Sequence, residues 1–175
     1  MEKIKKLKTK LSDDPAVMLK QAVSDLRAAI KAGYDIDMSD WYRKDYRGCH
    51  VCLAGAALIR RHAHPRDGFD LDKCKIKQKL LALDDFRCGM IYSGLARLGL
   101  QEVYGASDAP VLDISSSLFE NDPEKFFQAM EGVIEILKVL KKRNEVKVKL
   151  RKEMKEALQP FDSEITMVSS SIGVA

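Results

Sequence analysis

Apolar residues recur every three or four positions along most of this chain, which is the spacing of one face of an α-helix. Before Gly33, six apolar residues share such a face: Leu19, Ala22, Val23, Leu26, Ala29 and Ile30. Asp13 or Asp14 can cap this helix, and Pro15 suits its first turn. Gly33 can end it in the left-handed conformation. The pattern therefore predicts a first helix between these signals.

Three further helices are expected in the middle of the chain. Helix two covers about residues 49–61 and is rich in small residues, which favours close packing between neighbours. Helix three covers about 73–84, with Ile76, Leu80, Leu81 and Leu83 inward, and helix four about 86–98, with Met90, Ile91, Leu95 and Leu98 inward. Residues 34–48 look like a loop that carries Tyr34, Trp41, Tyr42 and Tyr46, and residues 100–120 look irregular.

The sequence after residue 120 predicts the longest helix. Asn121 or Asp122 caps it and Pro123 occupies its first turn. Its apolar stripe comprises Phe126 or Phe127, Met130, Val133, Ile134, Leu137 and Leu140 or Val139. Beyond Asn144 the helix either continues to Leu158 or bends, and Pro160 is expected to end it, leaving a tail of weak β character.

These elements predict an all-α fold: a compact bundle of about five to seven helices, with a central small-residue helix and a long basic C-terminal helix. The expected divisions are a basic N-terminal arm (1–12), a helical core (13–120), a long C-terminal helix or helix pair (121–159) and a tail (160–175). The length of 175 residues suits one domain, and 46% hydrophobic with 32% charged residues is typical of a globular protein.

The composition also indicates where the protein is located. No apolar run reaches the roughly 18 residues that cross a bilayer, and the first residues do not resemble a secretory signal. We therefore expect a cytoplasmic location without membrane association, where the four cysteines stay reduced.

The net charge of +4 is concentrated near the C-terminal end, since residues 138–155 hold nine Lys or Arg against Glu145 and Glu153. Five lysines of one helix face are the predicted partner-binding residues: Lys138, Lys141, Lys142, Lys149 and Lys152. This face is suited to an acidic partner, either a protein or a nucleic acid. The alternative is that it is an ordinary helix face exposed to solvent.

The cysteines are the main candidates for chemistry. Cys49 and Cys52 are spaced so that two thiolates can share a zinc ion, which needs two more ligands. His62, His64, Cys74 and Cys88 are available, and only the latter two come from another element, so any metal set is Cys49, Cys52, Cys74 and Cys88. We favour buried thiols, with Trp41, Cys49, Cys52 and Gly55 as packing residues.

Motifs of the common enzyme classes are missing. The sequence contains neither a phosphate-binding glycine loop nor a Gly-x-Ser-x-Gly elbow. We therefore assign no catalytic residue, metal or cofactor, and expect a protein that is not an enzyme.

Residues 36–61 resemble small uncharacterised proteins of phages and bacteria that share an Asp-Met-Ser-x-Trp element, a cysteine-containing start and an apolar Ala/Gly helix. The matching positions are Asp37, Met38, Ser39, Trp41, Cys49, Cys52, Leu53, Ala54, Gly55 and Ala56. The resemblance implies a phage protein that binds host machinery, for example an inhibitor of host defence.

Three hypotheses of function follow. The leading one is a non-enzymatic, phage-type interaction protein that binds and inhibits or modulates a host protein or nucleoprotein complex. The second is a nucleic-acid-binding protein that uses residues 138–155, and the third is a zinc- or thiol-dependent protein that uses Cys49 and Cys52. Homo-oligomerisation is left open by the sequence.

Overall fold

The computed structural model describes residues 4–39, 41–45, 48–62, 74–115 and 117–171. Its helices are α1 (Pro15–Lys31), α2 (Leu53–Arg61), α3 (Lys77–Arg87), α4 (Ile91–Arg97), α5 (Leu118–Asn121) and α6 (Pro123–Ser171). Three strands, β1 (Asp35–Ile36), β2 (Tyr42–Asp45) and β3 (Gly48–Val51), and a 3₁₀ turn, η2 (Ala106–Asp108), complete the described elements. The predicted all-α fold with a long C-terminal helix is confirmed.

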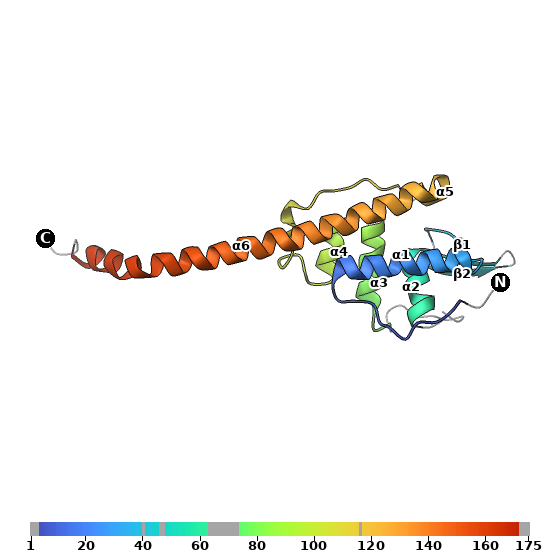
Figure 1. Cartoon of the computed structure of the whole chain (residues 1–175), viewed down its shortest axis with the longest axis horizontal. Coiled ribbons are helices and arrows are strands. Elements are labelled where there is room, and N and C mark those ends of the chain that lie inside the picture. Colours follow the sequence, from blue (N-terminus) through green and yellow to red (C-terminus); the bar gives the residue numbers. More distant parts are fainter. Residues whose placement is uncertain (1–3, 40, 46–47, 63–73, 116, 172–175) are drawn as a thin grey trace.

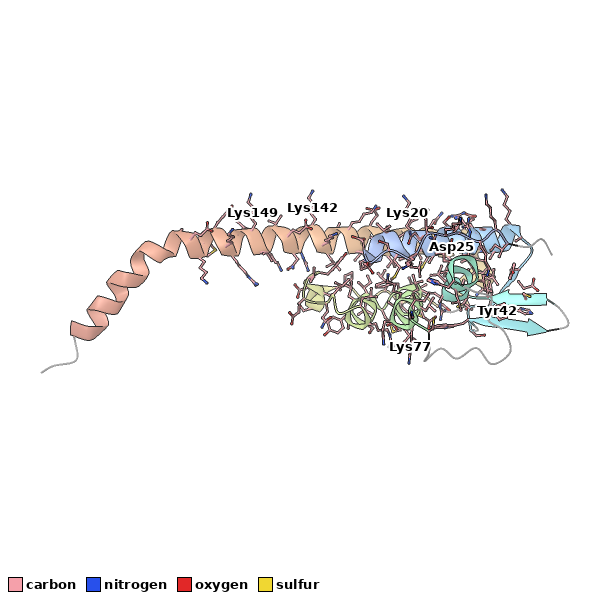
Figure 2. The ribbon with its side chains drawn as sticks, turned by 90° about the horizontal axis from the view of Figure 1, so that it is seen from below. Lys20, Asp25, Tyr42, Lys77, Lys142 and Lys149 are labelled. Carbon is pink, nitrogen blue, oxygen red and sulfur yellow. The ribbon has the colours of Figure 1, made fainter. Side chains whose placement is uncertain are left out.

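The helices form two layers. Helices α1 and α6 lie side by side in one layer, while α2, α3 and α4 form the other (Figure 2). Helix α2 contacts both α1 and α3, so it lies at the centre of the body. Helix α6 continues far beyond the body, so its last described turns lie away from the other described elements (Figure 1).

Helix α1 begins where the sequence predicts. The side chain of Asp14 caps it, because Oδ1 accepts hydrogen bonds from the amides of Ala16 (3.0 Å) and Val17 (3.1 Å). Five of the six predicted apolar residues are buried. The inward placement of Ile30 was wrong, since this side chain near the end of the helix is 39% exposed.

Helix α2 is the best-buried element. Every residue from Leu53 to Ile59 is buried. Gly55 has no room for a side chain, because a Cβ atom there would lie 1.5 Å from the backbone carbonyl oxygen of Trp41. The small residues therefore let the Trp41 segment lie directly on the helix.

The segment before α2 is a small sheet, so the predicted loop over 34–48 and the helix start at Cys49 were wrong. The strand order is β1-β3-β2, with β1 parallel and β2 antiparallel to β3. Cys49 belongs to β3, and Cys52 is the N-cap residue of α2. Backbone pairing of β3 with both neighbours outweighs the helical spacing that residues 49–52 share with α2.

Helices α3 and α4 begin later than predicted. Helix α3 starts at Lys77 and α4 at Ile91. Gly89 separates them at φ 77°, and a Cβ atom there would lie 2.1 Å from the carbonyl oxygen of Leu112. Met90 was wrongly placed inward, since it precedes α4 and is 43% exposed.

The N-terminal stretch packs on the body from Ile4 onward. Ile4 and Leu11 are buried, and the amide of Leu7 donates to the carbonyl oxygen of Arg60 at 2.8 Å. Lys79 of α3 donates to the carbonyl oxygen of Leu11 at 2.8 Å. This part of the predicted arm is therefore held by the ends of α2 and α3.

Helix α6 is one helix of 49 residues. Asp122 caps it, since its carboxylate accepts from the amide of Lys125 at 3.1 Å. The predicted end at Pro160 was wrong, because the helix continues to Ser171. The distal part of α6 bends (Figures 1 and 2).

Candidate interaction surface

The first half of α6 is part of the hydrophobic core. Met130, Val133 and Leu137 are fully buried against the body. At the start of α6, the rings of Phe126 and Phe127 each meet the ring of Phe119 edge to face. These contacts fix the direction in which the rest of α6 leaves the body.

An ion pair joins α6 to the start of α1. The ammonium of Lys141 lies 2.8 Å from a carboxylate oxygen of Asp14. Burial opposes ionisation of Asp14, but the hydrogen bonds from Lys141 and from the helix amides outweigh it and lower the pKa of this carboxyl group. Burial and the nearby negative charge of Asp14 raise the pKa of Tyr104 to about 12.

Asn144 marks the point where α6 leaves the body. Its side-chain amide donates to the carbonyl oxygens of Glu102 (3.2 Å) and Val103 (2.8 Å). The neighbouring turn accommodates it through Gly105, where a Cβ atom would lie 2.9 Å from the Asn144 side-chain oxygen. One turn later, Lys147 reaches Asp108 at 3.9 Å.

Beyond Lys147, the helix projects away from the body (Figure 1). Every side chain from 145 to 157 is exposed. Four of them are large and apolar, and more than half of each is exposed: Val146 (52%), Val148 (56%), Leu150 (52%) and Met154 (63%). A helix without tertiary contacts obtains little stability from packing, so this segment is an interaction candidate.

Most of these apolar residues lie along one line. Val146, Leu150, Met154 and Ala157 are spaced four, four and three residues apart. At 100° per residue these four positions fall within an arc of about 80°, and we call them the distal stripe. Val148 lies on the opposite face.

The five predicted partner-binding lysines occupy several environments. Lys138 pairs with Glu135 (2.6 Å), Lys149 with Glu153 (3.8 Å) and Lys152 with Glu156 (3.8 Å). Lys141 forms an ion pair with Asp14. Lys142 and Lys149 point away from the body (Figure 2). Carboxylates of the chain itself therefore neutralise four of the five.

The cysteines occupy packing positions. Cys49 is 6% exposed and lies 3.8 Å from the hydroxyl of Tyr42. Cys52 is fully buried, and its sulfur accepts from the amide of Gly55 at 3.4 Å. Burial raises the pKa of Cys52 to about 11, so the effect of burial exceeds the expected effect of the helix N-terminus.

The zinc alternative has no site within the described part of the chain, where no three His, Cys, Asp or Glu residues lie close enough to hold a metal ion. Cys74 and Cys88 are only partly buried. His64, another ligand considered, lies outside the described residues.

A buried charge cluster escaped the sequence reasoning. Asp25 of α1 is completely buried and accepts hydrogen bonds from Arg60 (2.9 Å) and from the guanidinium of Arg61. Arg61 also donates to the hydroxyl of Thr9 at 2.9 Å. The cluster thus ties α1, α2 and the N-terminal stretch together. The sequence did contain one signal of this buried charge, because Asp25 lies between Ala22 and Ala29 on an otherwise apolar helix face.

Surface grooves in the described part of the chain border α1. One, of about 590 Å³, lies between α1 and α6 and is lined by Lys20, Val23, Ser24, Arg27, Glu131, Gly132, Ile134, Glu135 and Lys138. The other, of about 600 Å³, lies where the end of α1 meets β1, α5 and the start of α6. In the first groove, basic residues from both helices stand beside acidic residues of α6, as is usual between two surface helices.

Comparison of the chain with protein-family models, curated proteins and solved structures gave no match. The resemblance of residues 36–61 to small phage and bacterial proteins stays a prediction. No helix in the described part of the chain combines the length and apolar character needed to span a membrane.

Proposed function

We propose that this protein is a non-enzymatic interaction protein whose working surface is the distal part of α6. One observation carries the proposal: from 145 to 157 every side chain of a continuous helix is exposed, including Val146, Leu150 and Met154 on one face. Single exposed apolar residues are common on proteins. A stripe of them along the part of a helix that projects from the body is typical of a helix that binds another helix or an apolar groove.

A protein partner fits this surface better than a nucleic acid. Phosphate binding depends on cations that are available to neutralise it, yet Lys138, Lys149 and Lys152 face carboxylates on α6 itself. The distal stripe is apolar, whereas a phosphate backbone presents charge. The nucleic-acid hypothesis stays a prediction, as does the zinc- or thiol-dependent one.

The nature of the partner is the finer part of the proposal. The resemblance at residues 36–61 favours a host protein or nucleoprotein complex, with inhibition or modulation as the outcome. That segment packs inside the body, where Gly55 and Trp41 are in contact. The segment thus supports the body, while the projecting helix presents the binding surface.

A residue-specific cross-linking experiment tests the proposal. A photo-reactive phenylalanine analogue is placed at Leu150 in the full-length chain, with the analogue at Val148 as a matched control. The two positions are similarly exposed, at 52% and 56%, but lie on opposite faces. We expect a discrete cross-linked product in cells from position 150 only. Equal or absent products from the two positions would refute the proposal.

A further inference from the structure

The apolar line of the distal stripe extends back along the part of α6 that packs on the body. Val139 lies seven residues before Val146, and seven residues make almost two helical turns, so the two side chains share one face. Val139 is 62% exposed, although Leu137 and Leu140 beside it are buried. From Val139 to Ala157 the line covers 19 residues, or about 28 Å of helix. This face of α6 therefore points away from the body and is open to a partner.

One border of the line carries cations only. Arg143, Lys147 and Arg151 follow at four-residue spacing along one side of the stripe, and we call them the basic border. Asp108 faces the first two, at 3.6 Å from Arg143 and 3.9 Å from Lys147, but exposed pairs at such distances are weak. Arg151 has no ion pair within the described part of the chain. The basic border therefore keeps an excess of positive charge.

The other border is mixed. Lys142 is exposed and points away from the body (Figure 2). Lys149 and Glu153 pair with each other at 3.8 Å, so they leave little charge for a partner. Over the whole segment 139–157 the chain has eight Lys or Arg against three Glu. Positive charge thus outweighs negative charge around the stripe, and the excess is greatest along the basic border.

We propose that this surface binds an acidic amphipathic helix of another protein, whose apolar face covers the stripe and whose Asp or Glu residues lie against the basic border. The inference rests on the proposed function and names the chemistry of its partner. Between paired helices, the apolar seam supplies affinity and the charged borders select the partner. Carboxylates of the partner supply the counter-charges that this chain lacks along the basic border.

The same features disfavour other occupants. A second copy of the chain would set one positive surplus against another. A nucleic acid presents phosphates rather than an apolar surface to the stripe. Helices that lie on anionic membranes bury large aromatic and leucine side chains over a broad face. The stripe is narrower, at about 80°, and consists of Val146, Leu150, Met154 and Ala157.

Designed peptides are defined probes for the full-length chain. One helical peptide carries leucines along one face and Glu on both borders, and a matched peptide has the same leucines with Gln on the borders. By fluorescence anisotropy at low salt, we expect the Glu peptide to bind at least about tenfold more tightly than the Gln peptide. The difference should shrink at high salt, because exposed charges are screened. Equal Kd values for the two peptides would overturn the inference.

The other occupants are measured under the same conditions. Duplex DNA, single-stranded RNA and vesicles of anionic lipid are titrated with the full-length chain, and each should bind more weakly than the Glu peptide. Light scattering of the chain alone should give the monomer mass of 19.7 kDa. Tighter binding of a nucleic acid or of the vesicles, or a dimer that Leu150→Lys dissociates, would replace the acidic helix as the occupant and refute the inference.

Two matched pairs of variants locate the site. Arg151→Glu reverses a charge of the basic border and should weaken binding of the Glu peptide at least about fivefold, whereas Lys155→Glu makes the same change on the opposite face and should have little effect. Leu150→Ala should weaken binding of both peptides about tenfold, and Val148→Ala is its control. All four side chains are exposed, so circular dichroism should show an unchanged fold. Equal effects within a pair would contradict the site.

The inference and the proposed function fail in different ways. If Leu150 cross-links to another protein in cells but the Glu and Gln peptides bind equally, the proposed function stands and the inference is refuted. If position 150 gives no product and neither peptide binds, both are refuted. A discrete product from position 150 only, together with a preference for the Glu peptide that Arg151→Glu removes, supports both.

Discussion

Gly55 contributes to the fold because it has no side chain. The carbonyl oxygen of Trp41 occupies the place where a Cβ atom would stand. Helix α6 offers a matched control in Gly132, which is exposed and has nothing within 4 Å of a Cβ atom.

Exchange of these two glycines for alanine should have opposite effects. Gly55→Ala forces the Trp41 segment away from α2, and we expect a loss of about 3 kcal/mol or more in the free energy of unfolding. Gly132→Ala improves helix propensity and should stabilise the protein by about 0.5–1 kcal/mol. Urea unfolding of both variants measures the difference, and equal effects would contradict the contact.

Asp14 makes the stability of the fold depend on pH. Its pKa lies below the ordinary value of 3.8 in the folded chain, so its charge stabilises the fold above that pH and the contribution disappears as pH falls through the folded-state pKa. Asn also caps helices, so Asp14→Asn removes mainly the pair with Lys141. We expect a loss of about 0.5 kcal/mol at pH 7, and this loss should shrink as the pH falls below 3.8 through the folded-state pKa. A loss that does not change with pH would contradict this origin.

Single residues also show where sequence reasoning ends. The cap at Asp14 and the apolar faces of α1 and α6 follow from local chemistry, so they were predictable. The pairing of Asp25 with Arg60 and Arg61 joins residues 35 and 36 positions apart, and local spacing carries no information about such contacts. Only the unusual acidic residue on an apolar face pointed toward it.

At the scale of elements, Asp25 connects α1 to α2 inside the body. Asp25→Ala would leave two guanidinium groups without their buried counter-charge, and we expect it to cost about 3–5 kcal/mol of unfolding free energy. Glu131→Gln, an exposed change on α6, is the control and should alter stability by less than about 0.5 kcal/mol. Thermal unfolding followed by circular dichroism checks both, and a mild effect of Asp25→Ala would show that the arginines find other partners.

Long helices were easier to predict than short strands. The period of α1 and of the first half of α6 is sustained over several turns, whereas β1 has two residues and β2 and β3 have four each. Strands this short are held by backbone pairing with their neighbours, which the pattern of side chains does not show, so 34–51 looked like a loop leading into a helix. The four-four-three spacing of the distal stripe is present in the sequence, but the spacing alone does not show whether that helix face is buried or exposed.

At the scale of the whole molecule, α6 determines the dimensions. A compact chain of 175 residues has a radius of gyration of about 16 Å. A straight helix of 49 residues is itself about 73 Å long. We expect small-angle X-ray scattering of the chain at low concentration to give a radius of gyration of more than about 20 Å. A value near 16 Å would mean that α6 folds back on the body.

The departure of α6 from the body at Asn144 has a consequence for proteolysis. Lys149, Arg151, Lys152 and Lys155 all follow this point on exposed helix. Trypsin should therefore cleave an isolated chain here first and release a trimmed, still folded body. A partner bound to the stripe would slow that cleavage, so the rate of digestion measures how much of this segment is unbound.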